Sequence, residues 1–98
     1  MNRISRMRDA LAALDPLELE IIDESHLHAG HAGAASGRGH FRVRLVSNRF
    51  TGLAPLARHR AVYDALGAML QTDIHALTLE TLSPAEAARP PSRTAITA

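Results

Sequence analysis

The stretch HFRVRLVSNRFTGLAPLARHRAVYDAL, residues 40–66, decides the fold because it predicts a strand, a turn and a helix in direct succession. Apolar and arginine side chains alternate in its first part, which is typical of a strand with one buried face. The apolar positions are Phe41, Val43 and Leu45, and the arginines between them are Arg42 and Arg44. The segment NRFTGLAP, residues 48–55, is then a predicted turn.

The rest of this stretch predicts a helix from Leu56 to Leu70, with Pro55 suited to the first helical position. We expect one face of it to be buried, made of Leu56, His59, Tyr63, Leu66 and Leu70 and widened by Val62 and Met69. His59 is therefore interpreted as a buried, structural imidazole. Gly67 would weaken the helix by roughly 1 kcal/mol relative to alanine.

Two elements are predicted on the N-terminal side of this stretch. The first is a helix with one apolar stripe at 3, 4, 3 spacing, formed by Ile4, Met7, Leu11 and Leu14. Asp15-Pro16 ends that helix. The second is a half-buried strand in PLELEIIDE, residues 16–24, whose inward positions are predicted to be Leu17, Leu19 and Ile21.

On the C-terminal side, IHALTLETL, residues 74–82, predicts a third strand with Leu77 and Leu79 inward. The segment SPAE, residues 83–86, supplies an N-cap serine, a proline and a capping-box glutamate for a short last helix. We expect one domain over residues 1–89 and a disordered C-terminal tail over residues 90–98.

The predicted order is therefore helix, strand, strand, helix, strand, short helix. The first two strands are adjacent in the sequence and are expected to pair antiparallel. A strand–helix–strand crossover is right-handed, and its two strands are parallel if they are neighbours. The fold class predicted is α/β (α+β), with a three-stranded mixed sheet and helices packed on a face.

The amino-acid composition limits the kinds of metal binding and catalysis that the chain can carry out. The chain has 98 residues, no cysteine and a formal net charge of +1. Disulfides are excluded, and any soft-metal chemistry must use histidine, with sulfur supplied from elsewhere. No nucleophile elbow, phosphate loop or membrane-spanning apolar run is present in the sequence. We therefore expect a protein that is not an enzyme and does not enter a membrane. Its location is predicted to be cytoplasmic, although the absence of cysteine does not by itself indicate a compartment.

Histidines gather in ESHLHAGHAGAASGRGHF, residues 24–41, which holds four of the six in the chain. His26 and His28 form an H-x-H pair that can chelate a metal, and His31 follows closely. The competing interpretation is a solvated loop with incidental histidines. His40 is expected to face outward with the strand arginines, and His75 to lie at the edge of the core face. A structural role is the simpler interpretation of both.

Several segments resemble the BolA family over roughly residues 3–87. They are LEIIDESHLHAGH, GHFRVRLVSNRFTGL, RHRAVYDAL and DIHALTLETL. One departure is Ala54, where many relatives have a serine that would cap the helix. The resemblance implies a class II KH-like fold and a partnership with monothiol glutaredoxins. It also implies a [2Fe–2S] cluster held between a glutaredoxin cysteine, glutathione and histidine from the BolA-like chain.

The resemblance also implies the ligands. The invariant family ligand falls on His75 in IHAL, and the variable loop ligand falls on His28, with His31 as the alternative and His26 less favoured. Because it has no thiol, the isolated chain is expected to bind no cluster. Separately, it is expected to be a monomer or a weak dimer. The function implied is that of an iron–sulfur accessory protein in cluster trafficking or iron homeostasis.

Two other functions are kept open. KH-like folds bind nucleic acids, so the chain is alternatively a transcriptional regulator that uses the RFTGL turn and nearby arginines. Those arginines are Arg42, Arg44, Arg49, Arg58 and Arg60. The near-neutral charge, the scarcity of aromatic residues and the absence of a G-x-x-G loop argue for only weak DNA binding. The third possibility is an interaction module without metal.

Overall fold

The computed structural model describes residues 2–25 and 39–89. The helical elements are α1 (Arg3–Leu11), η1 (Ala12–Leu14), η3 (Asn48–Phe50), α3 (Pro55–Leu66), α4 (Met69–Thr72) and α5 (Pro84–Ala87). The strands are β1 (Pro16–Asp23), β2 (Gly39–Ser47) and β3 (Ile74–Leu82). The predicted tail, residues 90–98, lies outside the described residues.

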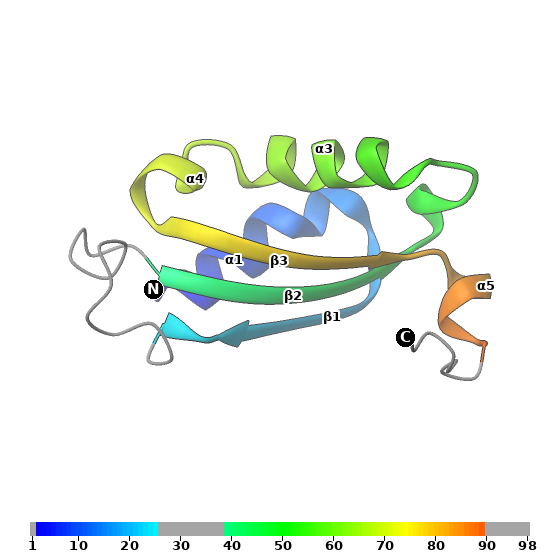
Figure 1. The fold of residues 1–98 in the computed structure, drawn as a ribbon, viewed down its shortest axis with the longest axis horizontal. Coiled ribbons are helices and arrows are strands. Elements are labelled where there is room, and N and C mark those ends of the chain that lie inside the picture. The colour runs from blue at the N-terminus through cyan, green and yellow to red at the C-terminus, as the bar shows by residue number, and fades with distance from the viewer. Residues whose placement is uncertain (1, 26–38, 90–98) are drawn as a thin grey trace.

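The three strands form one sheet in the order β1-β2-β3, with β1 antiparallel and β3 parallel to the central β2. The predicted α+β class with a three-stranded mixed sheet is therefore confirmed. Figure 1 shows α4 at the end of the sheet where β3 begins and α5 at the opposite end. None of the described helices is long and apolar enough to cross a membrane.

The core lies between α1, α3 and the face of the sheet that they cover. Its buried side chains come from all the larger elements: Met7, Leu11, Leu14, Ile21, Phe41, Val43, Leu45, Phe50, Val62, Leu66 and Ile74. The stripe predicted for the first helix and the inward positions predicted for β2 are thus confirmed. With few aromatic residues, this core is mainly aliphatic.

The buried face predicted for α3 is confirmed for Val62 and Leu66 and wrong for Leu56 and Tyr63. Leu56 is 63% exposed and Tyr63 is 41% exposed, whereas Arg58, Val62 and Leu66 are the buried positions. Apolar residues surround much of this helix, so their pattern alone did not select a face. The helix also stops at Leu66, because Gly67 adopts a positive φ of 56° and separates α3 from α4.

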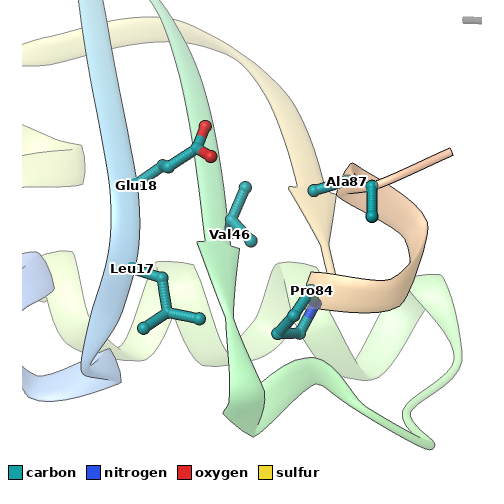
Figure 2. Close-up of a pocket in the computed structure, with 6 residues that line it drawn as sticks. Leu17, Glu18, Val46, Pro84 and Ala87 are labelled. Carbon is teal, nitrogen blue, oxygen red and sulfur yellow. The ribbon is translucent and has the colours of Figure 1, made fainter. Parts of the chain in front are cut away.

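The inward position predicted for Leu17 is also wrong, since this side chain is 58% exposed. The register of β1 against β2 shifts between Pro16 and Glu18, so Leu17 is an extra residue that upsets the alternation. Figure 2 shows Leu17 gathered with Val46 and Pro84 at a shallow pocket beside α5. There α5 covers Val46, which is only 2% exposed.

A buried arginine joins α3 to the last helix. The guanidinium of Arg58 donates two hydrogen bonds to the Glu86 carboxylate, at 2.6 and 3.2 Å. It also donates to the backbone carbonyls of Leu53 and Thr81, at 2.9 and 3.0 Å. Glu86 is the capping-box residue of α5, paired with Ser83 as predicted. Hydrogen bonds from Arg58 lower the pKa of Glu86 to about 2.

Replacing Glu86 by glutamine is expected to lower the free energy of unfolding by about 2 kcal/mol. Loss of one partner from a fully buried ion pair costs about 3–5 kcal/mol. We expect the lower value of about 2 kcal/mol here because the Glu86 side chain is 33% exposed, and water reduces the cost. Urea denaturation at neutral pH measures the difference. The matched control is Glu18→Gln, which removes a pair with Arg44 on the surface and should cost less than about 1 kcal/mol.

The stabilising effect of Glu86 is also expected to depend on pH. Because folding lowers the pKa of Glu86 from 4.5 to about 2, its contribution is fully present above pH 4.5 and is lost as the pH falls toward 2. The stability difference between the native chain and Glu86→Gln should shrink over that interval. A difference that stays constant from pH 5 to pH 2 would contradict this account of the pair.

Candidate functional site

The candidate site lies at the end of the sheet where β2 and β3 begin and β1 ends (Figure 1). Gly39 pairs with Ile74 and His40 pairs with Ala76, so the register skips His75. His75 is thus the extra residue of a β-bulge, a feature that re-aims a side chain. Its side chain is exposed.

The bulge brings two imidazoles together. The ring centroids of His40 and His75 are 5.2 Å apart, and the ring planes are tilted by 49°. Strand alternation had predicted the two rings on opposite faces, and the bulge is the reason that they meet. His40 was interpreted as structural in the sequence, and only the parallel pairing of β2 with β3 shows that it belongs to the site of His75.

The backbone of His40 is held on both sides. Its amide donates to the Ser25 Oγ at 3.0 Å, and its carbonyl accepts from the Glu24 amide at 2.8 Å. The Asp23 carboxylate in turn accepts from the Ser25 amide at 2.8 Å. The residues that flank segment 26–38 are therefore fastened to each other beside His75. The predicted ligands His28 and His31, like His26, lie outside the described residues.

Glycine is required at position 39 by this close approach. A Cβ built on Gly39 would lie 2.6 Å from the Ser25 Oγ and 2.8 Å from the Phe41 ring. The Gly39 amide also donates to the carbonyl of Asp73 at 2.9 Å, which joins the start of β2 to the residue before β3.

A buried carboxylate fixes the start of β3. Asp73 accepts two hydrogen bonds from the Arg6 guanidinium, at 2.9 and 3.0 Å, and contacts Arg3 at 3.5 Å. These bonds, with one from Thr72, hold the pKa of Asp73 below its usual range despite burial. The N-terminal turn of α1 is thereby tied to the chain just before His75. Sequence reasoning missed this pair, because the two partners are far apart in the sequence.

Charges on the opposite face of the sheet are balanced within the chain. Arg42 pairs with Glu24 at 3.0 Å, and Arg44 pairs with Glu18 at 2.6 Å and with Glu80 at 3.4 Å.

Within residues 2–25 and 39–89, no group of three histidine or carboxylate side chains is placed to hold a metal ion. The two imidazoles are therefore an incomplete ligand set by themselves.

A family model described as BolA-like protein matches residues 11–86 of the chain. The chain belongs to the BolA family. The BolA-like chain is 45% identical over 89 residues to Protein BOLA1, chloroplastic, of Arabidopsis thaliana, an alignment that covers 87% of this chain and 56% of the relative. It is 50% identical over 70 residues to the DNA-binding transcriptional regulator BolA of Escherichia coli, which covers 71% of this chain and 64% of that protein.

Among solved structures, BolA1 from Arabidopsis thaliana matches with a TM-score of 0.76 and 41% identity, over 92% of this chain and 99% of that chain. This match supports the fold described above. The two sequence relatives are longer proteins, of which this chain spans 56% and 64%. One of them carries a chloroplastic name, so the cytoplasmic location stays a prediction.

Asp73→Asn is expected to loosen the start of β3, because an amide holds the Arg6 guanidinium less strongly than a carboxylate does. Hydrogen bonds to charged groups contribute about 1.5–3 kcal/mol, so we expect the free energy of unfolding to fall by about 2 kcal/mol. The Gly39 amide should exchange faster, and the ring resonances of His40 and His75 should shift in NMR spectra.

The control is Asp9→Asn, which changes an exposed aspartate on α1. It should leave both ring resonances and the exchange of the Gly39 amide unchanged. An Asp73→Asn protein in which that amide exchanges as slowly as in the native chain would show that the Arg6 contact does not fix β3.

Proposed function

We propose that this BolA-family protein is an iron–sulfur accessory protein that shares a [2Fe–2S] cluster with a monothiol glutaredoxin and glutathione, in cluster trafficking or iron homeostasis. The cluster is its cargo, and the chain catalyses no reaction of its own in this proposal. The observation that carries it is the exposed imidazole of His75, presented on a fixed strand start beside the anchored ends of the histidine-bearing segment.

The available ligand atoms suit a shared cluster rather than one held by this chain alone. With no cysteine, the chain offers imidazole and carboxylate but no thiolate. Histidine can replace cysteine on one iron of a [2Fe–2S] cluster, and this raises the reduction potential. The second iron would then need thiolates from glutaredoxin and glutathione. Because imidazole can be protonated, such ligation also suits release of the cluster.

Chain length favours His28 over His31 as the loop ligand, while the preference for His28 over His26 comes from the resemblance to the BolA family. A fully extended chain spans about 3.3–3.6 Å per residue, so His28 lies within about 10 Å of Ser25 and His31 within about 20 Å. Ser25 is itself bonded to His40 at the site. Fewer residues thus separate His28 than His31 from the anchored Ser25, which is the reason for preferring His28 to His31. We propose His28 and His75 as the ligands, with His31 as the alternative.

His75→Ala should abolish the visible circular dichroism of the cluster in a complex copurified with a monothiol glutaredoxin, because it removes a direct ligand. His28→Ala should weaken that signal more than His31→Ala or His26→Ala does. The matched control is His59→Ala, which removes an imidazole from α3 and should keep the signal. A full signal from His75→Ala would contradict the assignment, as would a stable cluster on the isolated chain.

The competing function is DNA binding, which is in the name of the Escherichia coli relative. The arginines that would carry it are mostly engaged. Arg42, Arg44 and Arg49 pair with carboxylates, and Arg58 is buried against Glu86. Arg60 is exposed on α3. Phosphate binding would therefore have to break existing ion pairs.

Binding to random duplex DNA should accordingly be weak, on the order of 10⁻⁴–10⁻⁶ M, and should fall as salt rises. Fluorescence anisotropy at two salt concentrations measures it, with holo-glutaredoxin titrated in parallel. A nanomolar, sequence-selective DNA complex that survives both His28→Ala and His75→Ala would favour the regulator. Binding of apo-glutaredoxin with no cluster under any condition would favour the interaction module without metal.

A further inference from the structure

The two edge strands of the sheet differ in how well their outer edges are protected. An edge strand presents unpaired N–H and C=O groups that another strand can join, and proteins block such edges with proline, bulges and charged side chains. β1 begins at Pro16, shifts register before Glu18, and exposes Glu18 and Glu20. Arg8 also donates to the carbonyl of Leu19 at 3.3 Å. The β1 edge is therefore a poor template for a further strand.

The outer edge of β3 is much less protected beyond the bulge at its start. The strand sequence, IHALTLETL, has no proline and one formally charged residue, Glu80. The carbonyl of Thr81 accepts a hydrogen bond from Arg58 at 3.0 Å, so it points away from β2. Because backbone direction alternates along a strand, the N–H and C=O groups of Leu77 and Leu79 also point away from β2. Among the residues that the structure describes, no hydrogen bond reaches those groups.

The helix α3 lies beside this open edge. α1 contacts β1 and α3 contacts β3, so the flank of α3 that is turned away from α1 is the flank beside the β3 edge (Figure 1). Ala61 and Ala65 pack against the core. Another side of the helix carries Leu56 and Tyr63, two large side chains that are exposed. An open strand edge and an exposed apolar helix flank are therefore neighbours.

Tyr63 lies level with the open part of β3. Arg58 contacts Thr81, and Tyr63 is five residues further along α3, or about 7.5 Å at 1.5 Å per residue. α3 runs back between two parallel strands, so it runs opposite to β3. Strand residues are about 3.3 Å apart, so this distance corresponds to about two residues of β3. Tyr63 is thus near Leu79, whose edge groups are unpaired.

We propose that the β3 edge binds an extended segment of a partner protein, which adds beside β3 as a fourth strand. Main-chain hydrogen bonds to Leu77 and Leu79 supply the affinity, and apolar side chains on one face of the segment contact Tyr63. On the other face an arginine or lysine lies opposite Glu80, whose side chain is 59% exposed. β2 already shows this complementarity, because Arg44 is opposite Glu80 in the native pairing and contacts it at 3.4 Å.

A second copy of this chain fits the β3 edge poorly. Paired strands lie about 4.8 Å apart, whereas packed helices need about 8–10 Å between their axes. Because α3 packs on β3, pairing of β3 between two copies would bring their α3 helices too close together. An extended segment brings no helix with it and avoids this clash. The partner is therefore a strand with apolar residues on one face and a basic residue on the other.

The test is an NMR titration of the full chain with an end-blocked peptide of sequence HFRVRLV, which copies residues 40–46 of β2. With the peptide in excess, amide exchange at Leu77 and Leu79 should slow about tenfold or more, because strand addition gives these amides partners. The ring resonances of Tyr63 should shift in the same titration. Exchange at Leu19 on the β1 edge should not change, although the peptide copies the strand that also pairs with β1.

Charge reversal tests the need for a basic residue. Glu80→Arg should weaken binding of HFRVRLV about threefold or more, because like charges opposite each other on neighbouring strands are destabilising. It should strengthen binding of the peptide HFEVELV. The matched control is Glu20→Arg, which reverses the same charge on the other side of Arg44. Both affinities should stay within about twofold there, because position 20 lies about 14 Å from the added strand, beyond the Debye length of about 8 Å.

Several results would overturn the proposal. Protection of Leu19 in place of Leu77 and Leu79 would put the added strand on β1, and a shift of Tyr63 without slower exchange would mean docking on the helix alone. Protection that rises with protein concentration in the absence of peptide would mean self-pairing. No protection at about 1 mM peptide would rule out strand addition. None of these outcomes bears on the cluster, because the titration contains no glutaredoxin, glutathione or iron.

Discussion

Parallel pairing of β2 with β3 is the interaction on which the site depends. Two parallel strands begin at the same end of a sheet, so residues far apart in the sequence meet there. In this chain the pairing places His40 and His75 at one end, and the bulge between them turns both rings to the same side. The crossover through α3 and α4 makes that pairing reachable, since parallel strands need a long connection.

Two arginines, Arg6 and Arg58, join separate elements of the described fold. Arg58 fastens α5 and the end of β3 to α3, and Arg6 fastens α1 to the start of β3. Both guanidiniums make paired hydrogen bonds to a carboxylate, the geometry in which arginine exceeds lysine. The two clamps lie at opposite ends of β3, so the strand that carries His75 is held at both ends. This use of arginine also leaves less positive charge for nucleic acid.

The elements were predictable from local patterns, but their faces were only partly so. The strong alternation in β2 and the apolar stripe of α1 predicted the buried side chains correctly, because each of these two elements has one apolar face and one charged face. In α3, apolar residues lie on several sides of the helix, so their pattern did not single out the buried face. Arg58 lies on the face that is buried, where Glu86 neutralises its charge. In β1 a single extra residue moved Leu17 away from the core, and no local signal marks such a bulge.

The sequence by itself determined the order of the elements, the capping box of α5, the absence of thiols and the likeness to the BolA family, because these depend on residue identity and short-range spacing. Tertiary structure decided which imidazole accompanies His75. Strand alternation predicts that His40 and His75 lie on opposite faces of the sheet. The register skip between the parallel strands β2 and β3 is what brings their rings into contact. Tertiary structure also decided that Asp73 and Arg6 support that site, since their contact joins residues that only the folded chain brings within hydrogen-bonding distance.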